Sequence, residues 1–247
     1  MNFFDQYPRF YRTSQTSPWP RRLNARHAAI IGPNVEALKG RRVIDIASHD
    51  GRWTFAALQA GATHVVGIEP RAELIANARE SLTHYGVSSD RYELRQGDVF
   101  DLLDGSLQAD VVLCLGFYYH TIRHAELLDR IERTGARLVV IDTEVAPMDS
   151  AVPRLDDPRL VYGNPYVIQL LQDPVDDQQM ACADALTRKG RTLVGRPSRA
   201  AIQFMAEHFG FNHDSYPWRD HFQRHPADAE DMVDYFEGWR DTFYLTR

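Results

Sequence analysis

The chain has 247 residues, of which 44% are hydrophobic and 25% are charged, so it is long enough for one α/β domain with a sizeable core. Its formal net charge of -6 excludes a broadly basic surface of the kind that attracts nucleic acid or anionic membranes nonspecifically. The only cysteines, Cys114 and Cys182, exclude a disulfide framework or a cysteine metal cage. These features favour a small-molecule partner over nucleic acid. They also favour a cytoplasmic protein without a membrane span, because no apolar run is long enough to cross a bilayer.

The first 40 residues predict a helical extension that precedes the first strand. Prolines interrupt its beginning, and a helical pattern follows. Arg21, Arg22, Arg26 and His27 cluster in this segment. Such a cluster can bind a phosphate or a carboxylate or contact a subunit, although solvated helix charge is the default interpretation. The extension is placed to cover the ligand-binding end of the first strand.

Residues 41–142 alternate short apolar runs with helical patterns, which is typical of consecutive βαβ units. We expect strands at 42–47, 63–69, 91–98, 109–116 and 136–144, and helices at 53–61, 70–86 and 125–135. The predicted fold class is therefore α/β, with a doubly wound, mostly parallel Rossmann-like sheet.

The second half of the chain predicts an insertion followed by completion of the sheet. Residues 143–190 contain five prolines and several acidic residues, so we expect a cap, either a lid or a dimer arm of a homo-oligomer. Residues 191–247 contain an N-capped amphipathic helix at 198–211 and two closing antiparallel strands, at 211–216 and 241–247. With the extension 1–40 and the core 41–142, these segments form a single predicted domain, 1–247.

The loop after the first strand, in the sequence VIDIASHDG, predicts the kind of ligand. Ligands of an open α/β sheet bind beyond the carboxyl ends of its strands. A pyrophosphate-binding turn needs three glycines, and only Gly51 is present here, which disfavours an NAD-dependent oxidoreductase. A nucleoside without phosphate needs less backbone clearance, and Glu69 at the end of the second strand can accept hydrogen bonds from ribose hydroxyls.

Residues 41–142 resemble the core of the class I S-adenosylmethionine-dependent methyltransferases. The segment DIASHDG keeps the family's acid and last glycine but departs from its alternating glycines at Ala47 and His49. The resemblance implies that S-adenosylmethionine is the cofactor, that Glu69 holds the ribose, and that Asp98 accepts the adenine amino group while Val99 packs on the ring. The cofactor-binding residues expected in this way are Asp45, Ala47, His49, Gly51, Glu69, Pro70, Asp98, Val99, Leu115 and Gly116.

The end of the fourth strand, in the sequence GFYYHT, predicts the catalytic corner. A sulfonium is already an activated electrophile, so the protein has to align the acceptor and, for a hydroxyl, remove a proton. His120 is the expected general base, and the alternative is a histidine that only hydrogen-bonds the next turn. Tyr119 can wall the pocket. Asp142, at the end of the fifth strand, can orient His120, hold a sugar hydroxyl or bind a divalent ion with Glu144, although no metal is expected.

These features predict O-methylation of a small-molecule acceptor such as a natural product, a sugar or a glycolipid precursor. Two alternatives stay open. The segment GFYYH also resembles a subgroup that includes the tRNA wobble-uridine carboxymethyl transferases, which implies a tRNA-modifying methyl or carboxymethyl transferase. A noncatalytic nucleoside-binding protein would use the same binding residues without turnover.

Overall fold

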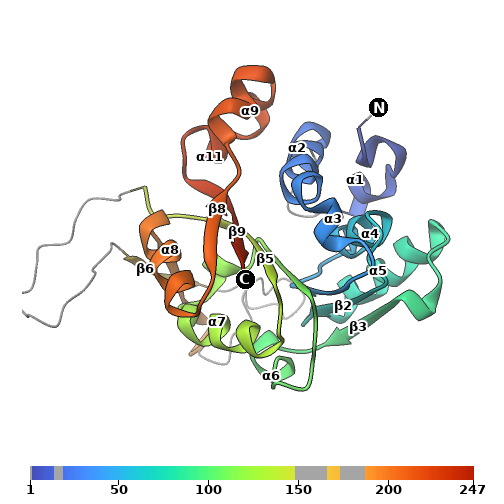
Figure 1. Ribbon diagram of the computed structural model, residues 1–247, viewed down its shortest axis with the longest axis horizontal. Coiled ribbons are helices and arrows are strands. Elements are labelled where there is room, and N and C mark those ends of the chain that lie inside the picture. The colour runs from blue at the N-terminus through green and yellow to red at the C-terminus, as the bar shows by residue number, and fades with distance from the viewer. Residues whose placement is uncertain (1, 14–18, 148–165, 173–186) are drawn as a thin grey trace, which may run out of the picture.

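The computed structural model describes residues 2–13, 19–147, 166–172 and 187–247, and its centre is a seven-stranded sheet (Figure 1). The strands lie in the order β3-β2-β1-β4-β5-β9-β8. Their bounds are β1 Arg42–Ile46, β2 His64–Glu69, β3 Tyr92–Gln96, β4 Val111–Leu115, β5 Leu138–Glu144, β8 Asn212–Ser215 and β9 Arg240–Thr246. Strands β1 to β5 are parallel, whereas β9 runs antiparallel between β5 and β8. This topology confirms the predicted doubly wound sheet with antiparallel closing strands.

Helices cover both faces of the sheet, which is why its central strands are nearly continuous runs of buried Val, Ile and Leu. Successive strand residues point to opposite faces, so Val43 packs in one core and Ile44 in the other. The core that contains Val43 is closed by α3 Val35–Leu38, α4 Arg52–Gln59 and α5 Ala72–His84. The core that contains Ile44 is closed by α6 Val99–Leu102, α7 His124–Arg133 and α8 Arg199–His208. Short 3-10 turns are η2 Gly32–Asn34 and η3 Ser89–Arg91.

The predicted N-terminal extension is helical and is packed into the molecule. It consists of η1 Phe4–Gln6, α1 Arg9–Thr13 and α2 Pro20–Ile30, with Pro20 at the first helical position, where its missing N–H costs nothing. Phe4, Phe10 and Leu23 are fully buried in the same core as Val43. The extension is therefore fixed to the sheet, and α2 is held near the carboxyl ends of the strands.

Two strands lie in a region where none was predicted. Strands β6 Tyr166–Gln172 and β7 Arg191–Pro197 form a separate antiparallel pair, so residues 191–197 do not extend the main sheet. Backbone hydrogen bonds from Gly195 to Thr121 and from Ala146 to Pro197 attach this pair beside the loops that follow β4 and β5. The rest of the predicted cap, 148–165 and 173–186, lies outside the described residues, as does Cys182.

The segment 217–240, for which no element was predicted, forms three short helices. They are α9 Trp218–Arg224, α10 Asp228–Asp231 and α11 Val233–Phe236. Trp218 and Tyr235 pack against Ala25 and Ala29 of α2 in a small apolar cluster of their own. Long-range packing of the two terminal segments on each other therefore orders this region. Across the described ranges, no helix is long and apolar enough to cross a membrane.

Candidate active site

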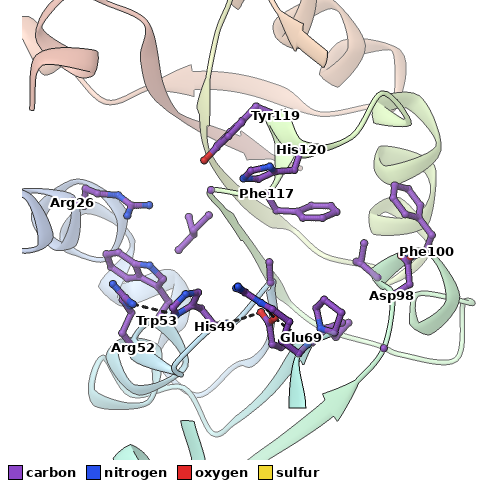
Figure 2. Close-up of a pocket in the computed structure, with 18 of the residues that line it drawn as sticks. Arg26, His49, Arg52, Trp53, Glu69, Asp98, Phe100, Phe117, Tyr119 and His120 are labelled. Atoms are coloured by element: carbon purple, nitrogen blue, oxygen red, sulfur yellow. Dashed lines mark hydrogen bonds and ion pairs between the residues drawn. The ribbon is translucent and has the colours of Figure 1, made fainter. Parts of the chain in front are cut away.

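A pocket opens at the carboxyl ends of β1, β2 and β4, and α2 and the start of β9 contribute to its wall (Figure 2). Ten of the residues predicted for the site line it, namely Ala47, His49, Glu69, Pro70, Asp98, Val99, Leu115, Gly116, Tyr119 and His120. The other three, Asp45, Gly51 and Asp142, are outside the lining as far as the structure describes it. Ten further lining residues were not among the predicted site residues, and these are Arg22, Arg26, Arg52, Trp53, Ile68, Arg71, Gly97, Phe100, Phe117 and Arg240.

The loop after β1 has a glycine-type backbone without the usual glycines. Ala47 and His49 both adopt left-handed conformations, with φ of 54° and 52°. Gly51 also has a positive φ, of 77°, and a Cβ at this position would lie 3.0 Å from the Cβ of Ala78. The departure from the glycine pattern therefore places two residues with side chains in left-handed conformations and adds backbone strain there, because side chains disfavour this region.

Glu69 is held rigidly at the end of β2. Its carboxylate accepts hydrogen bonds from the backbone N–H of His49 at 3.1 Å and from the backbone N–H of Arg71 at 3.2 Å. The Arg71 guanidinium donates a further bond at 3.1 Å. The side chain is nearly buried yet lines the pocket. It is therefore a preoriented acceptor, connected to the loop after β1, and it suits the hydroxyls of a ribose.

Two further acids, Asp45 and Asp50, are buried next to this loop and hydrogen-bond to residues near it. Asp45 accepts a hydrogen bond from the hydroxyl of Thr54 at 2.7 Å, and burial raises its pKa to about 7. Asp50 accepts a 2.6 Å bond from Nε of Arg52. Burial opposes ionisation of Asp50, but the charge of Arg52 and the hydrogen bonds from His49 and Arg52 outweigh it, so its pKa lies well below its usual range. Both acids therefore support the loop, and Arg52, which Asp50 holds, faces the pocket.

The other end of the pocket is an apolar slot that ends in a carboxylate. Asp98 caps α6 by accepting a hydrogen bond from the backbone N–H of Phe100 at 2.8 Å. Val99, Phe100 and Phe117 supply the apolar walls, with the two aromatic ring centroids 6.4 Å apart. Such a slot suits a flat heteroaromatic ring that carries an amino group at its edge.

The turn after β4 brings two of the predicted catalytic residues to the pocket. In η4, Tyr118–His120, the side chain of Tyr118 is fully buried, whereas Tyr119 and His120 line the cavity (Figure 2). The rings of Tyr119 and His120 lie 4.1 Å apart between centroids. Burial, reinforced by the charges of Arg240 and Arg196, lowers the pKa of His120 to about 4. The imidazole is therefore neutral near pH 7, so one ring nitrogen is an acceptor.

Asp142 is fully buried and engages four donors. One carboxylate oxygen accepts hydrogen bonds from Arg26 and Arg240, each at 3.0 Å. The other accepts bonds from the hydroxyl of Tyr235 at 2.6 Å and from that of Thr242 at 2.9 Å. Burial disfavours the charged form, but the two arginines outweigh it and the pKa of Asp142 is lowered. The structure thus places Asp142 beneath the arginines of the pocket wall.

The sequence placed Arg22 and Arg26 in a basic cluster but did not predict Arg52, Arg71 and Arg240 as pocket residues. The spacing of Arg22 and Arg26, one helical turn apart, is the available signal that both side chains share one face of α2. Arg240 has no local signal, because its position depends on how β9 pairs with β5. A metal site at Asp142 and Glu144 gains no support, since the described residues contain no group of three or more His, Cys, Asp or Glu placed to hold an ion.

Comparison with known proteins agrees with this geometry. Residues 43–155 match a family model described as a methyltransferase domain. No curated protein sequence matches the chain. Among solved structures, the N-terminal domain of EvdMO1, determined in the presence of SAH and D-fucose, is 23% identical over 74% of this chain and 72% of that chain, with a TM-score of 0.55. The DhpI–SAH complex is 18% identical over 98% of this chain and 93% of that chain, with a TM-score of 0.57.

Magnesium protoporphyrin IX methyltransferase from Synechocystis, with bound SAM, is 12% identical over 100% of this chain and 85% of that chain, with a TM-score of 0.53. At these identities the solved structures establish a shared fold. The family match adds the activity, because it covers β1 to β5 and the loops that build the pocket. Residues 43–155 therefore match a methyltransferase domain, and the chain is an S-adenosylmethionine-dependent methyltransferase with the class I fold.

Proposed function

We propose that the chain methylates an oxygen atom of a small-molecule acceptor, such as a natural product, a sugar or a glycolipid precursor. The observation that carries this proposal is the position of His120, a buried and neutral imidazole that lines the same pocket as Glu69 and Asp98. The acidic balance of the chain, with a formal net charge of -6, favours a small acceptor over transfer RNA. The single-domain organisation, the cytoplasmic location and the homo-oligomer stay predictions.

The residues of the pocket fit S-adenosylmethionine along its length. Glu69 would accept hydrogen bonds from the ribose hydroxyls, and Asp98 would accept one from the adenine amino group, with Val99 and Phe117 against the ring. The methionine end of the cofactor would lie along the loop at Ala47, where the backbone is left-handed. When bound, S-adenosylmethionine supplies a methyl group activated by its sulfonium.

The remaining residues align the acceptor and accept its proton. His120 would take the hydroxyl proton as the acceptor oxygen bonds to the methyl carbon and the carbon–sulfur bond breaks, leaving S-adenosylhomocysteine. The ring of Tyr119 lies beside that of His120, tilted by 36°. Asp142 would act as a positioning residue, because it holds Arg26 and Arg240 at the wall rather than facing the cavity itself.

Substitution of His120 tests the proposal. We expect His120→Ala to lower methyl transfer by about a hundredfold or more while the affinity for S-adenosylhomocysteine stays unchanged, because the residue serves the acceptor. Transfer of labelled methyl to a panel of hydroxylated small molecules, with mass spectrometry of the products, gives the rate and the atom. His208→Ala, at an exposed position on α8, is the control. A wild-type rate in His120→Ala, or methyl groups found only on nitrogen or on transfer RNA, would contradict the proposal.

A further inference from the structure

One buried guanidinium in the pocket has hydrogen-bonding capacity that the protein does not use. Arg26 is 7% exposed and lines the pocket from α2. Its Nη2 donates to Asp142 at 3.0 Å, and the guanidinium carbon lies 5.2 Å from the centre of the Trp53 ring. Its Nε is buried, and no hydrogen-bond partner for it is found among the residues that the structure describes. Buried donors are almost always satisfied, so an unsatisfied one on a guanidinium that lines a pocket points to a ligand.

The charges around Arg26 are unbalanced. Arg22 binds Asp234, Arg26 and Arg240 share Asp142, and Arg196 binds Glu144. Arg240 also reaches Asp234 at 3.0 Å and Glu144 at 3.6 Å. This arginine cluster, Arg22, Arg26, Arg196 and Arg240, thus has four cations for three carboxylates. A sulfonium in the same pocket would add another positive charge, and an anion would offset the repulsion.

The location of Arg26 identifies the part of the pocket concerned. Figure 2 shows Arg26 on the opposite side of the cavity from Asp98 and Phe100, on the side towards which Tyr119 points. The adenine slot is therefore at one end and the arginine cluster at the other, beside the predicted proton acceptor. The planar guanidinium matches a carboxylate or a phosphoryl group, to which it can donate more than one hydrogen bond.

We propose that Arg26 and Arg240 bind an oxyanion of the acceptor, so that this methyltransferase acts on a hydroxylated small molecule that carries a carboxylate or a phosphoryl group. This inference rests on the proposed function, because it assigns the substrate class of the same pocket. The anion would accept hydrogen bonds from the guanidinium of Arg26 and would thereby fix the acceptor relative to His120.

Titration of simple anions tests the site directly. The protein is saturated with S-adenosylhomocysteine and titrated with inorganic phosphate and, separately, with acetate, by calorimetry. We expect binding that is at least tenfold weaker in Arg26→Met, weaker by a smaller factor in Arg26→Lys, and unchanged in Arg21→Met. Arg21 is the matched control because it lies on the same helix, half exposed, and binds Glu230 away from the pocket. Thermal melting of each variant confirms the fold, and equal binding by wild type and a folded Arg26→Met would overturn the inference.

The methionine carboxylate of the cofactor is the competing anion. Binding of S-adenosylhomocysteine is therefore compared with binding of 5′-methylthioadenosine, which lacks that carboxylate. If Arg26 serves the acceptor, Arg26→Met leaves the ratio of the two affinities unchanged. If Arg26→Met binds S-adenosylhomocysteine and 5′-methylthioadenosine with nearly equal affinity, Arg26 serves the cofactor carboxylate and the inference is overturned.

An assay of methyl transfer distinguishes failure of this inference from failure of the proposed function on which it rests. Hydroxylated acids and their neutral amides are offered in pairs, and we expect at least a tenfold preference for the acids that is lost in Arg26→Met. Equal methylation of acids and amides on oxygen would overturn the anion site and leave the proposed function standing. Anion binding that depends on Arg26, without oxygen methylation of any member of the panel, would refute the proposed function and leave the anion site standing.

Discussion

At the scale of single residues, the loop after β1 has a backbone conformation typical of glycine at two positions that are not glycine. Ala47 and His49 adopt left-handed conformations that glycine adopts without penalty. The backbone N–H of His49 donates to Glu69, so the conformation also orients the acid at the end of β2. The strain is therefore tied to the geometry of the site.

Replacement of Ala47 tests this strain. We expect Ala47→Gly to raise the free energy of unfolding by about 0.5 kcal/mol, because release of left-handed strain outweighs the lost methyl contact and the greater freedom of the unfolded chain. Ala76→Gly, at an exposed position within α5, should lower it by about 1 kcal/mol. Chemical denaturation of both variants measures the two changes, and the same sign for both would contradict the strain.

The role proposed for Glu69 is tested by its removal. Glu69→Ala should weaken the binding of S-adenosylhomocysteine by on the order of 1.5 to 3 kcal/mol, which is typical when a charged hydrogen-bond partner is lost. Glu93→Ala, at an exposed acid of β3 that binds Arg95, is the control and should leave the affinity unchanged. Calorimetric titration gives both values. Equal affinities for the Glu69→Ala variant and the wild type would rule out the ribose assignment.

At the scale of elements, buried charges join the two ends of the chain around the pocket. Arg26 of α2 and Arg240 of β9 meet at Asp142 of β5, and Tyr235 of α11 donates to the same carboxylate. A buried ion pair adds little net stability, but removal of one partner leaves an uncompensated charge. The network therefore makes the position of α2 depend on Asp142.

Asp142→Asn should accordingly destabilise the protein by about 3 kcal/mol or more, because two buried guanidinium groups lose their shared anion. The exposed pair of Asp129 and Arg133 on α7 offers the comparison, and Asp129→Asn should change stability by less than about 1 kcal/mol. Urea denaturation measures both. A loss as small in Asp142→Asn as in Asp129→Asn would show that the network does not hold α2.

At the scale of the whole molecule, buried histidines decide how stability responds to acid. Burial lowers the pKa of His27, His120 and His124 from 6.5 to about 4 in each case. Between these values the unfolded chain binds protons that the folded chain does not, so stability falls as pH decreases from 6.5 towards 4. Asp45 opposes this trend, because its pKa is raised to about 7 and its contribution falls as pH rises from 3.8 to 7.

The pKa of a fourth histidine, His221, is also lowered, and that of a second acid, Asp241, is also raised. With four histidines against two acids, we expect the free energy of unfolding to decrease as pH falls from 6.5 to 4. His27→Phe should reduce that decrease by about 2 kcal/mol, because it removes one proton uptake on unfolding and keeps a ring stacked on Phe3. Urea denaturation at a series of pH values compares the two slopes. Identical slopes would show that His27 does not contribute.

Much of the site could be predicted from the sequence because its positions follow from the strands. Glu69, Asp98 and His120 come at or just after the ends of β2, β3 and β4, and parallel strands bring those ends to one edge of the sheet. The alternation of apolar runs and helical patterns is local, so it determined the doubly wound sheet and this edge without any knowledge of distant contacts.

Only the tertiary structure decided which charged residues face the cavity. Arg26 and Arg240 lie near opposite ends of the chain, and both reach the pocket because β9 pairs with β5 and α2 packs against α9 and α11. Asp142 stands at the end of a strand like Glu69, yet it lies beneath the arginines rather than facing the cavity. The physical reason is that hydrophobic periodicity is encoded in neighbouring residues, whereas the partner of a buried charge depends on which distant segments pack together.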